Sequence, residues 1–353
     1  MPMPSISISF TEKAISAVKR GERGIVAMIL RDANVPATNP VVCLSNEDVP
    51  TTLTEANQKQ VKLALMGYVN APKKVLVYVI GESDEYTDAL DYLKTVKFDY
   101  LVVPTVGTDG KADDIVAYVK AQREDGKLIK AVLPNTVADC EGIINFATEK
   151  VFVNDEEYDT EEYCSRIAGI IAGTPITISC TYAPLAELTD CTRLTKADMD
   201  SAVDAGKLIV WFDGEKVKTA RGVNSLTTTT SDKGASFQKI KLVDAMDMIT
   251  DDIRMTAEDS YLGKYANSYD NKCLLISAIG SYFDQLIADG VLESASVEID
   301  IDANRLYLKG KGVDVDAMSD DDIKKANTGS FVYLKATIKI LDAIEDIVLP
   351  ITI

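Results

Sequence analysis

Hydrophobic and polar positions follow two different patterns along this chain. In the first half, continuous apolar runs such as Gly24–Leu30 (GIVAMIL) and Lys74–Ile80 (KVLVYVI) have the length of buried strands. Later runs alternate with segments of about ten residues whose apolar positions lie three or four apart, which predicts helices. Buried strands that alternate with helices are typical of a parallel sheet covered on both faces.

These patterns predict a doubly wound α/β domain from Gly24 to about Phe212, inside a larger domain of residues 21–226. The predicted helices are Asp84–Thr95, Asp113–Arg123, Glu161–Ala172 and Ala197–Ala205. The predicted strands between and after them are Tyr100–Val103, Leu128–Leu133 and Leu208–Phe212.

The pattern changes after a polar connector, Thr227–Gly234 (TTTTSDKG). Two long helices are predicted, Phe237–Met255 and Asn271–Ala288, and Asp289-Gly290 is a typical end for the second. Alternation then predicts three strands, Ser296–Ile301, Arg305–Lys309 and Phe331–Ile340. We therefore expect a second, α+β domain with an antiparallel sheet over residues 227–341.

Both ends of the chain have one apolar face. The segment Ser5–Phe10 (SISISF) alternates, and Ile347–Ile353 (IVLPITI) does the same, with Pro350 restricting that segment to a sheet edge. These strands either close a sheet of their own domain or pair with another chain. We expect extended arms, residues 1–20 and 342–353.

A free-energy comparison bears on the second alternative. Burying four large aliphatic side chains contributes roughly 6–12 kcal/mol, at about 1.5–3 kcal/mol each. Ordering seven residues costs about 1–2 kcal/mol for each residue. The two contributions nearly cancel, so a single arm would bind another chain weakly and become stable only within an assembly of many subunits.

The composition excludes several classes of function. The net charge of −18 argues against a nucleic-acid surface, which needs clustered basic residues. The start lacks the pattern of a secretory signal, and the apolar runs are too short for a membrane helix, so we expect synthesis in the cytoplasm and no membrane insertion. The six cysteines form no C-x-x-C pair, as is typical of reduced core residues.

Signs of catalytic chemistry are scarce. The 353 residues include no histidine, which removes the usual general base and the common nucleophile pairs. Gly107–Asp114 (GTDGKADD) lacks the spacing of a phosphate loop and is interpreted as a turn before a helix. Asp300–Arg305 (DIDANR) lacks the Gly and Glu of a calcium loop and is interpreted as a hairpin turn. We expect no cofactor, metal or catalytic residue.

An enzyme remains the competing hypothesis. An α/β sheet with a carboxylate-based or metal-assisted site would use residues such as Asp84, Asp88 or Asp113 near the strand ends. A convergent polar pocket at the carboxyl edge of the sheet would be its distinguishing feature. A self-assembling shell protein is a third class.

Two segments carry a resemblance to a known family. Lys218–Thr229 (KTARGVNSLTTT) and the closing Leu341–Ile353 (LDAIEDIVLPITI), together with the order of elements, resemble the tail sheath proteins of contractile phages. The short sheaths of Gram-positive myophages, defective prophages and R-type phage-tail-like bacteriocins are the most similar. The resemblance covers essentially the whole chain.

The resemblance implies a structural function. Subunits of this family form stacked six-membered rings around a rigid tube, and the sheath contracts to drive the tube through a target cell envelope. The α/β domain is then the outer domain and residues 227–341 the inner domain. The implied partners are further copies of the chain, the tail tube, and the baseplate and terminator proteins, in a virion tail or a released particle.

The resemblance also implies roles for residues. In this family the arms complete a sheet in neighbouring subunits. The donor residues would be Ile6, Ile8, Phe10, Ile347, Leu349, Ile351 and Ile353. The acceptor residues would be Leu306, Leu308, Val332, Leu334 and Ile338.

Two further segments have open interpretations. Arg221, Gly222 and Asn224 are expected to shape an interdomain turn, with a direct tube contact as the alternative, because Gly and Asn tolerate left-handed backbone geometry. The acidic residues of the first long helix either face a basic stripe on the tube or form a solvated face. They are Asp244, Asp247, Asp251 and Asp252.

Overall fold

Strand β1 (Ile25–Arg31) lies in the interior of the main sheet, and nearly all of its residues are apolar, so both of its faces can be buried. The computed structural model describes residues 17–352, so the predicted donors Ile6, Ile8, Phe10 and Ile353 lie outside the described residues. The chain divides into two compact units, and each consists of two separate stretches of sequence. The α/β unit contains residues 21–248 and 342–353, and the α+β unit contains residues 1–20 and 249–341.

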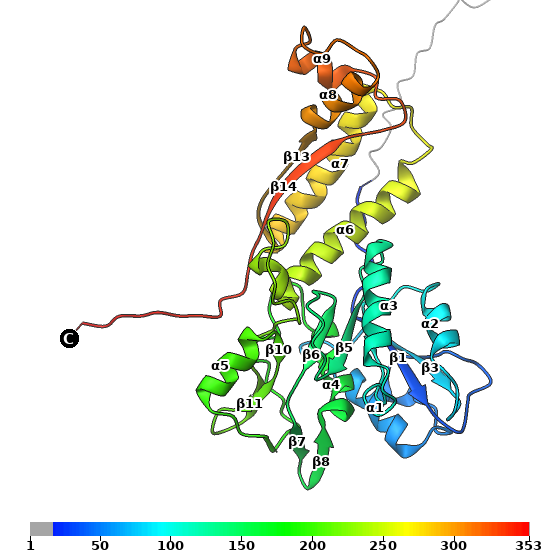
Figure 1. Ribbon diagram of the computed structural model, residues 1–353, viewed down its shortest axis with the longest axis vertical. Coiled ribbons are helices and arrows are strands. Elements are labelled where there is room, and N and C mark those ends of the chain that lie inside the picture. Colours follow the sequence, from blue (N-terminus) through cyan, green and yellow to red (C-terminus); the bar gives the residue numbers. More distant parts are fainter. Residues whose placement is uncertain (1–16, 353) are drawn as a thin grey trace, which may run out of the picture. The chain divides into compact units, whose positions relative to one another are not determined.

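The main sheet of the α/β unit has seven strands in the order β10-β6-β5-β4-β1-β3-β2 (Figure 1). All neighbours are parallel except β2, which runs antiparallel to β3. The register places Met28 beside both Val77 and Val102. The strands are β2 (Val41–Cys43), β3 (Lys74–Ile80), β4 (Tyr100–Val102), β5 (Lys130–Pro134), β6 (Ile143–Phe146) and β10 (Lys207–Leu208).

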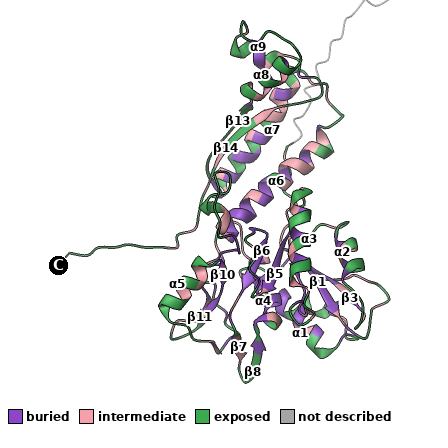
Figure 2. Cartoon of the chain, viewed as in Figure 1, coloured by how far each residue is buried: buried purple, intermediate pink, exposed green. Residues whose placement is uncertain are grey.

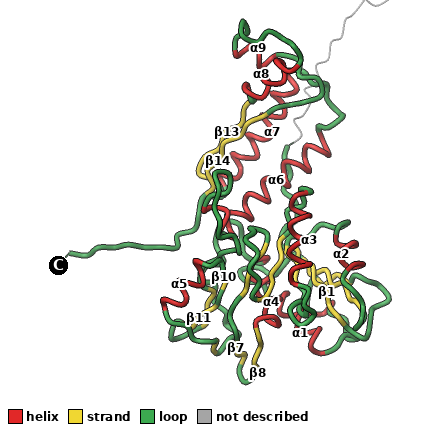
Figure 3. The backbone as a smooth tube through the Cα atoms, in the orientation of Figure 1, coloured by secondary structure: helices red, strands yellow, loops and turns green. Residues whose placement is uncertain are grey.

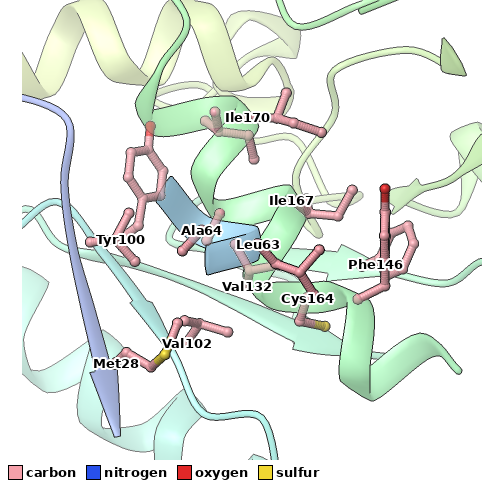
Figure 4. Close-up of a cluster of buried hydrophobic side chains, with 14 of the residues drawn as sticks. Met28, Leu63, Ala64, Tyr100, Val102, Val132, Phe146, Cys164, Ile167 and Ile170 are labelled. Carbon is pink, nitrogen blue, oxygen red and sulfur yellow. The ribbon is translucent and has the colours of Figure 1, made fainter. Parts of the chain in front are cut away.

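Helices cover both faces of this sheet, as a doubly wound fold requires. On one face the core contains residues of α1 (Glu55–Leu65) and α4 (Thr160–Ala172); Figure 4 shows part of it, with Met28 and Ile167. On the other face it contains residues of α2 (Thr87–Leu93) and α3 (Ala112–Glu124). Figure 2 shows the strands between them as buried. The predicted doubly wound domain is confirmed.

Local sequence fixes the start of α4. The Asp159 carboxylate accepts a hydrogen bond from the Glu162 amide, and the Glu162 carboxylate accepts one from the Asp159 amide. This capping box satisfies amide groups that have no partner within the helix. Gly169 brings α4 against α1, since a Cβ there would lie 2.1 Å from the Ala64 carbonyl oxygen. The predicted bounds of α4 differ from the observed ones by one residue.

Smaller elements complete the α/β unit. Three antiparallel strands lie in the order β8-β7-β9, and β11 pairs with β12. Ile209 divides the predicted strand over residues 208–212, because Leu208 ends β10 and Val210–Phe212 form β11. These elements are η1 (Asn46–Asp48), β7 (Lys150–Val153), β8 (Glu156–Asp159), β9 (Asp190–Cys191), α5 (Lys196–Asp204), β11 (Val210–Phe212), β12 (Val217–Thr219) and η2 (Ala235–Gln238).

Helix α6 (Ile240–Ser260) belongs to both units, with its residues up to Met248 in the α/β unit. In the α+β unit, α7 (Tyr269–Ala288) packs against β13 (Leu292–Ile299), which pairs antiparallel with β14 (Leu334–Ile340). The predicted boundary after residue 226 does not separate these units, because residues 227–248 belong to the α/β unit.

One predicted strand of the α+β unit is wrong. Residues 305–309 lie in helix α8 (Ile301–Gly310), so Asp300–Arg305 is a helix start and not a hairpin turn. The Asp300 carboxylate accepts a hydrogen bond from the Ala303 amide at 2.9 Å and caps the helix. Leu308 packs with Val315 and with Ile323 of α9 (Asp320–Lys325). The sheet of this unit therefore has two strands within the described residues.

Within residues 17–352, every helix falls short of the length or the apolarity that a bilayer span requires.

Candidate functional site

The C-terminal segment exposes its apolar side chains. Ile347, Val348, Leu349 and Ile351 are between 74% and 92% exposed. Figure 3 draws this segment as loop, and none of the described strands pairs with it. Such contiguous exposed apolar residues are a marker of an interaction site. Three predicted donor residues of this arm, Ile347, Leu349 and Ile351, are therefore largely exposed and pair with no described strand.

The residues just before this segment are bound to the α/β unit. The Lys239 ammonium donates to the carboxylates of Asp342 and Glu345, at 2.9 Å for Glu345. The Arg221 guanidinium donates to Asp346 at 2.6 Å. The Thr181 hydroxyl donates to Glu345 at 2.6 Å. We call residues 342–346 the arm root.

The electrostatics of the arm root favour the charged forms of its basic partners. Burial lowers the pKa of Lys239, but hydrogen bonds to Asp342 and Glu345 outweigh that effect and raise it. The hydrogen bond to Asp346 is the largest effect on Arg221 and raises its pKa. The contacts of the arm root are therefore charge-assisted.

The predicted turn residues lie inside the α/β unit and not between units. Gly222 and Asn224 do not have positive φ angles, so the expected left-handed geometry is wrong. Gly222 is required for space, since a Cβ would lie 2.8 Å from the Cys180 Sγ. The buried Asn224 side chain donates to the Phe237 carbonyl and accepts from the Leu226 amide. Arg221 contacts the arm root.

The predicted acceptor residues divide into two groups. Leu334 and Ile338 lie in β14, opposite Ile299 and Ala295 of β13, and Val332 lies just before β14. Within the described residues this sheet has no third strand, so it has unpaired edges.

The other two predicted acceptors do not lie in a strand. Leu306 and Leu308 belong to helix α8, where Leu308 is buried and Leu306 is exposed. A helix offers no strand edge, because its backbone groups are already bonded within it. The acceptor prediction is therefore not kept for Leu306 and Leu308.

Three of the four acidic residues of α6 named from the sequence, Asp244, Asp247 and Asp252, are buried in the subunit. Asp244 and Asp247 are 8% exposed and lie against the buried Lys130 and Tyr100. Asp252 is buried and accepts a hydrogen bond from Tyr282 within the α+β unit. Asp251 pairs with Arg254 on the same helix. Both earlier interpretations are wrong for Asp244 and Asp247.

This buried cluster is electrostatically balanced. Burial raises the pKa of Asp247, but Lys130 and Arg123 outweigh burial and lower it. Burial lowers the pKa of Lys130, and Asp247 and Asp244 raise it above its ordinary value. The cluster joins the first half of α6 to β5 and α3 inside the α/β unit.

An enzyme with this fold would have its site at the carboxyl edge of the main sheet. Strand β1 lies between β4 and β3, so the chain reverses its direction across the sheet at the end of β1. There the Arg31 guanidinium donates to the carbonyls of Gly81, Glu82 and Asp84 and to the Asp109 carboxylate. Hydrogen bonds from Tyr86, Thr105 and Arg31 outweigh burial and lower the pKa of Asp109. Arg31 thus fills the position where such folds bind ligands.

The other candidate catalytic positions have structural roles. The Asp84 carboxylate accepts from the Gly81 amide in a turn, and Asp88 and Asp113 lie in the first turns of α2 and α3. The amides of Gly107 and Thr108, which a phosphate loop would direct at its ligand, both donate to the Glu161 carboxylate instead. Among residues 17–352, no three acidic or cysteine side chains are grouped to hold a metal.

Sequence reasoning missed the residues that hold the arm root. Lys239 and Thr181 belong to no motif, and their partner Glu345 lies 106 residues from Lys239 in sequence. One signal was available, because the three acidic residues of the arm root precede the alternating segment directly.

The chain is similar to known proteins over nearly its whole length. Residues 82–225 match the family described as phage tail sheath protein central domain, and residues 232–353 match the phage tail sheath C-terminal domain. The boundary predicted after residue 226 falls between these two matches. The tail sheath protein of Clostridium phage phiCD119 is 41% identical over 350 residues, which is 97% of each chain. The phage-like element PBSX protein XkdK of Bacillus subtilis is 30% identical over 178 residues, covering 48% of this chain and 38% of that one.

Solved structures share the fold. The sheath tail protein of Desulfitobacterium hafniense has a TM-score of 0.70 at 20% identity, with 84% of this chain and 94% of that chain covered. The helical sheath of the anti-feeding prophage in the contracted state has a TM-score of 0.73 at 14% identity, with 100% and 99% covered. The match of both sheath domains, together with the 41% identical relative, shows that the chain belongs to the phage tail sheath protein family.

Proposed function

We propose that this chain is the subunit of a contractile sheath, which polymerises as stacked six-membered rings around a rigid tube. Contraction of the sheath drives the tube through a target cell envelope. The observation that carries the proposal is the exposed apolar arm, Ile347–Ile351, on a chain 41% identical to a tail sheath protein. The alternative of an enzyme has no support in the filled carboxyl edge of the sheet.

Strand donation explains how subunits connect. The arm has backbone groups and apolar side chains without partners of their own, and β13 and β14 have unpaired edges. Adding an extended segment to a sheet edge satisfies both sets of backbone groups, while side-chain pockets set the register. We assign the donor role to Ile347, Leu349 and Ile351 and the acceptor role to Leu334, Ile338 and the adjacent Val332.

The remaining predicted donors extend the same proposal to the other arm. Ile6, Ile8 and Phe10, with Ile353 at the C-terminal end, retain the alternation required to pair with a neighbouring subunit. Each subunit would then donate and receive strands, so that weak individual contacts add to a stable network.

The contact between donor and acceptor also sets the form of the assembly. The two surfaces differ, so copies join head to tail and continue into a helix unless the rotation closes a ring. Contraction is a rigid-body rotation and shift of subunits, with the arms as tethers. The extended sheath is held by a kinetic barrier, and the free energy stored during assembly is released on contraction.

The proposal includes several partners. They are further copies of the chain, the tail tube protein, the baseplate proteins and the tail terminator. Two of the similar solved assemblies are an anti-feeding prophage baseplate and a sheath complex of an extracellular contractile injection system. We propose that the chain is made in the bacterial cytoplasm and becomes part of a virion tail or a phage-tail-like particle.

Deletion of residues 347–353 tests strand donation. The truncated chain should remain folded, because the large apolar side chains of residues 347–351 are mostly exposed and add little to the core, and it should fail to form cylinders. Negative-stain microscopy and light scattering measure assembly, and circular dichroism checks the fold. Cylinders of normal length from the truncated chain would contradict strand donation, and flat arrays from the full chain would contradict the sheath.

A further inference from the structure

We propose that the arm root is an electrostatic anchor, in which Lys239 and Arg221 act as positioning residues that fix where the donated strand begins. This inference rests on the proposed function, because the anchor would control how far the same donor arm can reach. The anchor consists of Asp342, Glu345 and Asp346 on the arm side and of Lys239, Arg221 and Thr181 on the α/β unit.

In the arm root a charged side chain is buried and its apolar neighbour is exposed, which is the opposite of hydrophobic packing. The Glu345 side chain is 5% exposed, whereas the neighbouring Ile344 is 87% exposed. A carboxylate is buried at this level only where charged or hydrogen-bonding partners compensate for its lost hydration. Charge recognition, and not apolar contact, therefore holds the arm root on the α/β unit.

Hydrogen bonds and close packing hold the receiving surface in place. Thr181 accepts a hydrogen bond from the Gly222 amide at 2.9 Å and donates to Glu345, so the hydroxyl has a fixed orientation. Gly222 is close-packed on Cys180, and its carbonyl accepts from the Ile240 amide, next to Lys239. Arg221 and Lys239 thus project from a preorganised region. This gives the segment Arg221–Leu226 a role that a simple turn does not explain.

The anchor determines how far the arm can reach. With residues 342–346 bound, the seven residues 347–353 span at most ~24 Å when fully extended. If the root were released, the twelve residues 342–353 would span up to ~41 Å. A longer flexible tether lowers the effective concentration of the strand at a neighbouring acceptor. The anchored arm should therefore be the form that is efficient in assembly.

The test removes the charges of the anchor from the full-length protein. Lys239→Gln and Arg221→Gln are combined, and both side chains are partly exposed, so the fold is expected to persist. The matched control is Lys196→Gln, which removes an exposed ammonium paired with Asp200 in the same unit. Glu345→Gln is a second variant, since it removes the buried charge from the arm itself. Lys239→Arg alone, with Arg221 unchanged, retains the positive charge and should assemble like the parent.

Cleavage by a glutamate-specific protease reports on the anchor directly. In dilute, unassembled protein, cleavage after Glu345 should be about tenfold faster in the double variant than in the parent and in Lys196→Gln, since charge-assisted contacts are lost. Glu345→Gln lacks this cleavage site and is compared with the parent in the assembly assay. Unchanged cleavage rates would overturn the anchor.

Assembly tests the positioning role. The double variant should form fewer cylinders at equal concentration. A second chain carries a Gly-Ser linker after Asp346, with the same number of residues as the arm root. It should also form fewer cylinders, although its anchor is intact. Faster cleavage with unchanged assembly would overturn the positioning role. If deletion of residues 347–353 leaves assembly intact, strand donation itself is wrong. If that deletion abolishes assembly and the double variant assembles normally, only the anchor inference is overturned.

Discussion

The Lys130 ammonium lies 2.6 Å from a carboxylate oxygen of Asp247, and both side chains are almost fully buried in the α/β unit. Asp244 and Arg123 complete the contact, at 3.1 Å from Lys130 and from Asp247 respectively. The first half of α6 is therefore attached to the main sheet through charge as well as apolar packing.

Asp247→Ala should destabilise the α/β unit by up to about 3–5 kcal/mol, because the buried Lys130 and Arg123 would lose the carboxylate that they share and keep only Asp244 and Glu141 as partners. Urea unfolding followed by the fluorescence of Trp211, the one tryptophan of the chain, measures this unit. Asp200→Ala is the control, since it breaks an exposed ion pair with Lys196 and should cost less than about 1 kcal/mol. Equal effects of the two substitutions would contradict the structural role of the cluster.

Gly169→Ala should destabilise the same unit by about 1–3 kcal/mol, since a Cβ at this position meets the backbone of α1. The contrasting variant is Gly280→Ala in α7, where the nearest atom to a new Cβ is a Val297 methyl carbon at 3.9 Å. Helix propensity predicts a gain of up to about 1 kcal/mol there. Tryptophan fluorescence reports on the first variant and far-UV circular dichroism on the second. A neutral Gly169→Ala would contradict the close approach of α1 and α4.

Asp32 should make the stability of the α/β unit depend on acid pH. Burial raises its pKa, but hydrogen bonds from Asn34, Thr54 and Asn57 outweigh burial and lower the pKa from 3.8 to about 2. A carboxylate with a lowered folded-state pKa stabilises the fold above pH 3.8, and this contribution disappears as the pH falls toward 2. It amounts to about 2 kcal/mol at neutral pH.

The comparison of Asp32→Asn with the parent measures this effect. The difference in unfolding free energy should be large at pH 6 and shrink as the pH falls from 4 to 2, over the window given by the two pKa values. Asp204→Asn, at an exposed position, should change stability at pH 6 by less than about 0.5 kcal/mol. A constant difference for Asp32→Asn across this window would contradict the lowered pKa.

Leu349→Asp should abolish cylinder formation, because the side chain lies on the apolar face of the proposed donor strand and a charge cannot be buried there without a partner. Val348→Asp places the same charge on the opposite face and should retain most of the assembly. Both positions are exposed, at 74% and 92%, so neither variant should unfold the subunit. Negative-stain microscopy and sedimentation compare them. The alternation hypothesis is wrong if both variants assemble equally.

The main sheet was predictable from sequence because it is buried on both sides. Strands such as β1 and β3 have to be apolar along their whole length, and continuous apolar runs give an unambiguous signal. Short edge strands such as β2 and β9 have no comparable pattern, since their length of two or three residues carries no periodicity. Helix α1 was missed as well, because its first half is polar.

The region around Leu308 shows why a short pattern is ambiguous. Leu306 and Leu308 alternate as in a strand, yet Asn304 and Leu308 are also spaced as one face of a helix, and the Asp300 cap decides the outcome. The predictions for Asp244 and Asp247 of α6 were wrong for another reason. Sequence shows that Asp247 is charged, but not that Lys130, 117 residues away, neutralises it.

The division of the chain between the two units has a consequence for synthesis. The α/β unit is completed by residues 342–353, which leave the ribosome only after residues 249–341 have been made. At about 5–20 residues per second, the first stretch of the unit has several seconds to fold before its last one emerges. Under the proposed strand donation, a nascent chain therefore has no C-terminal donor segment until residues 249–341 have been made, so copies on one polysome cannot yet pair through it.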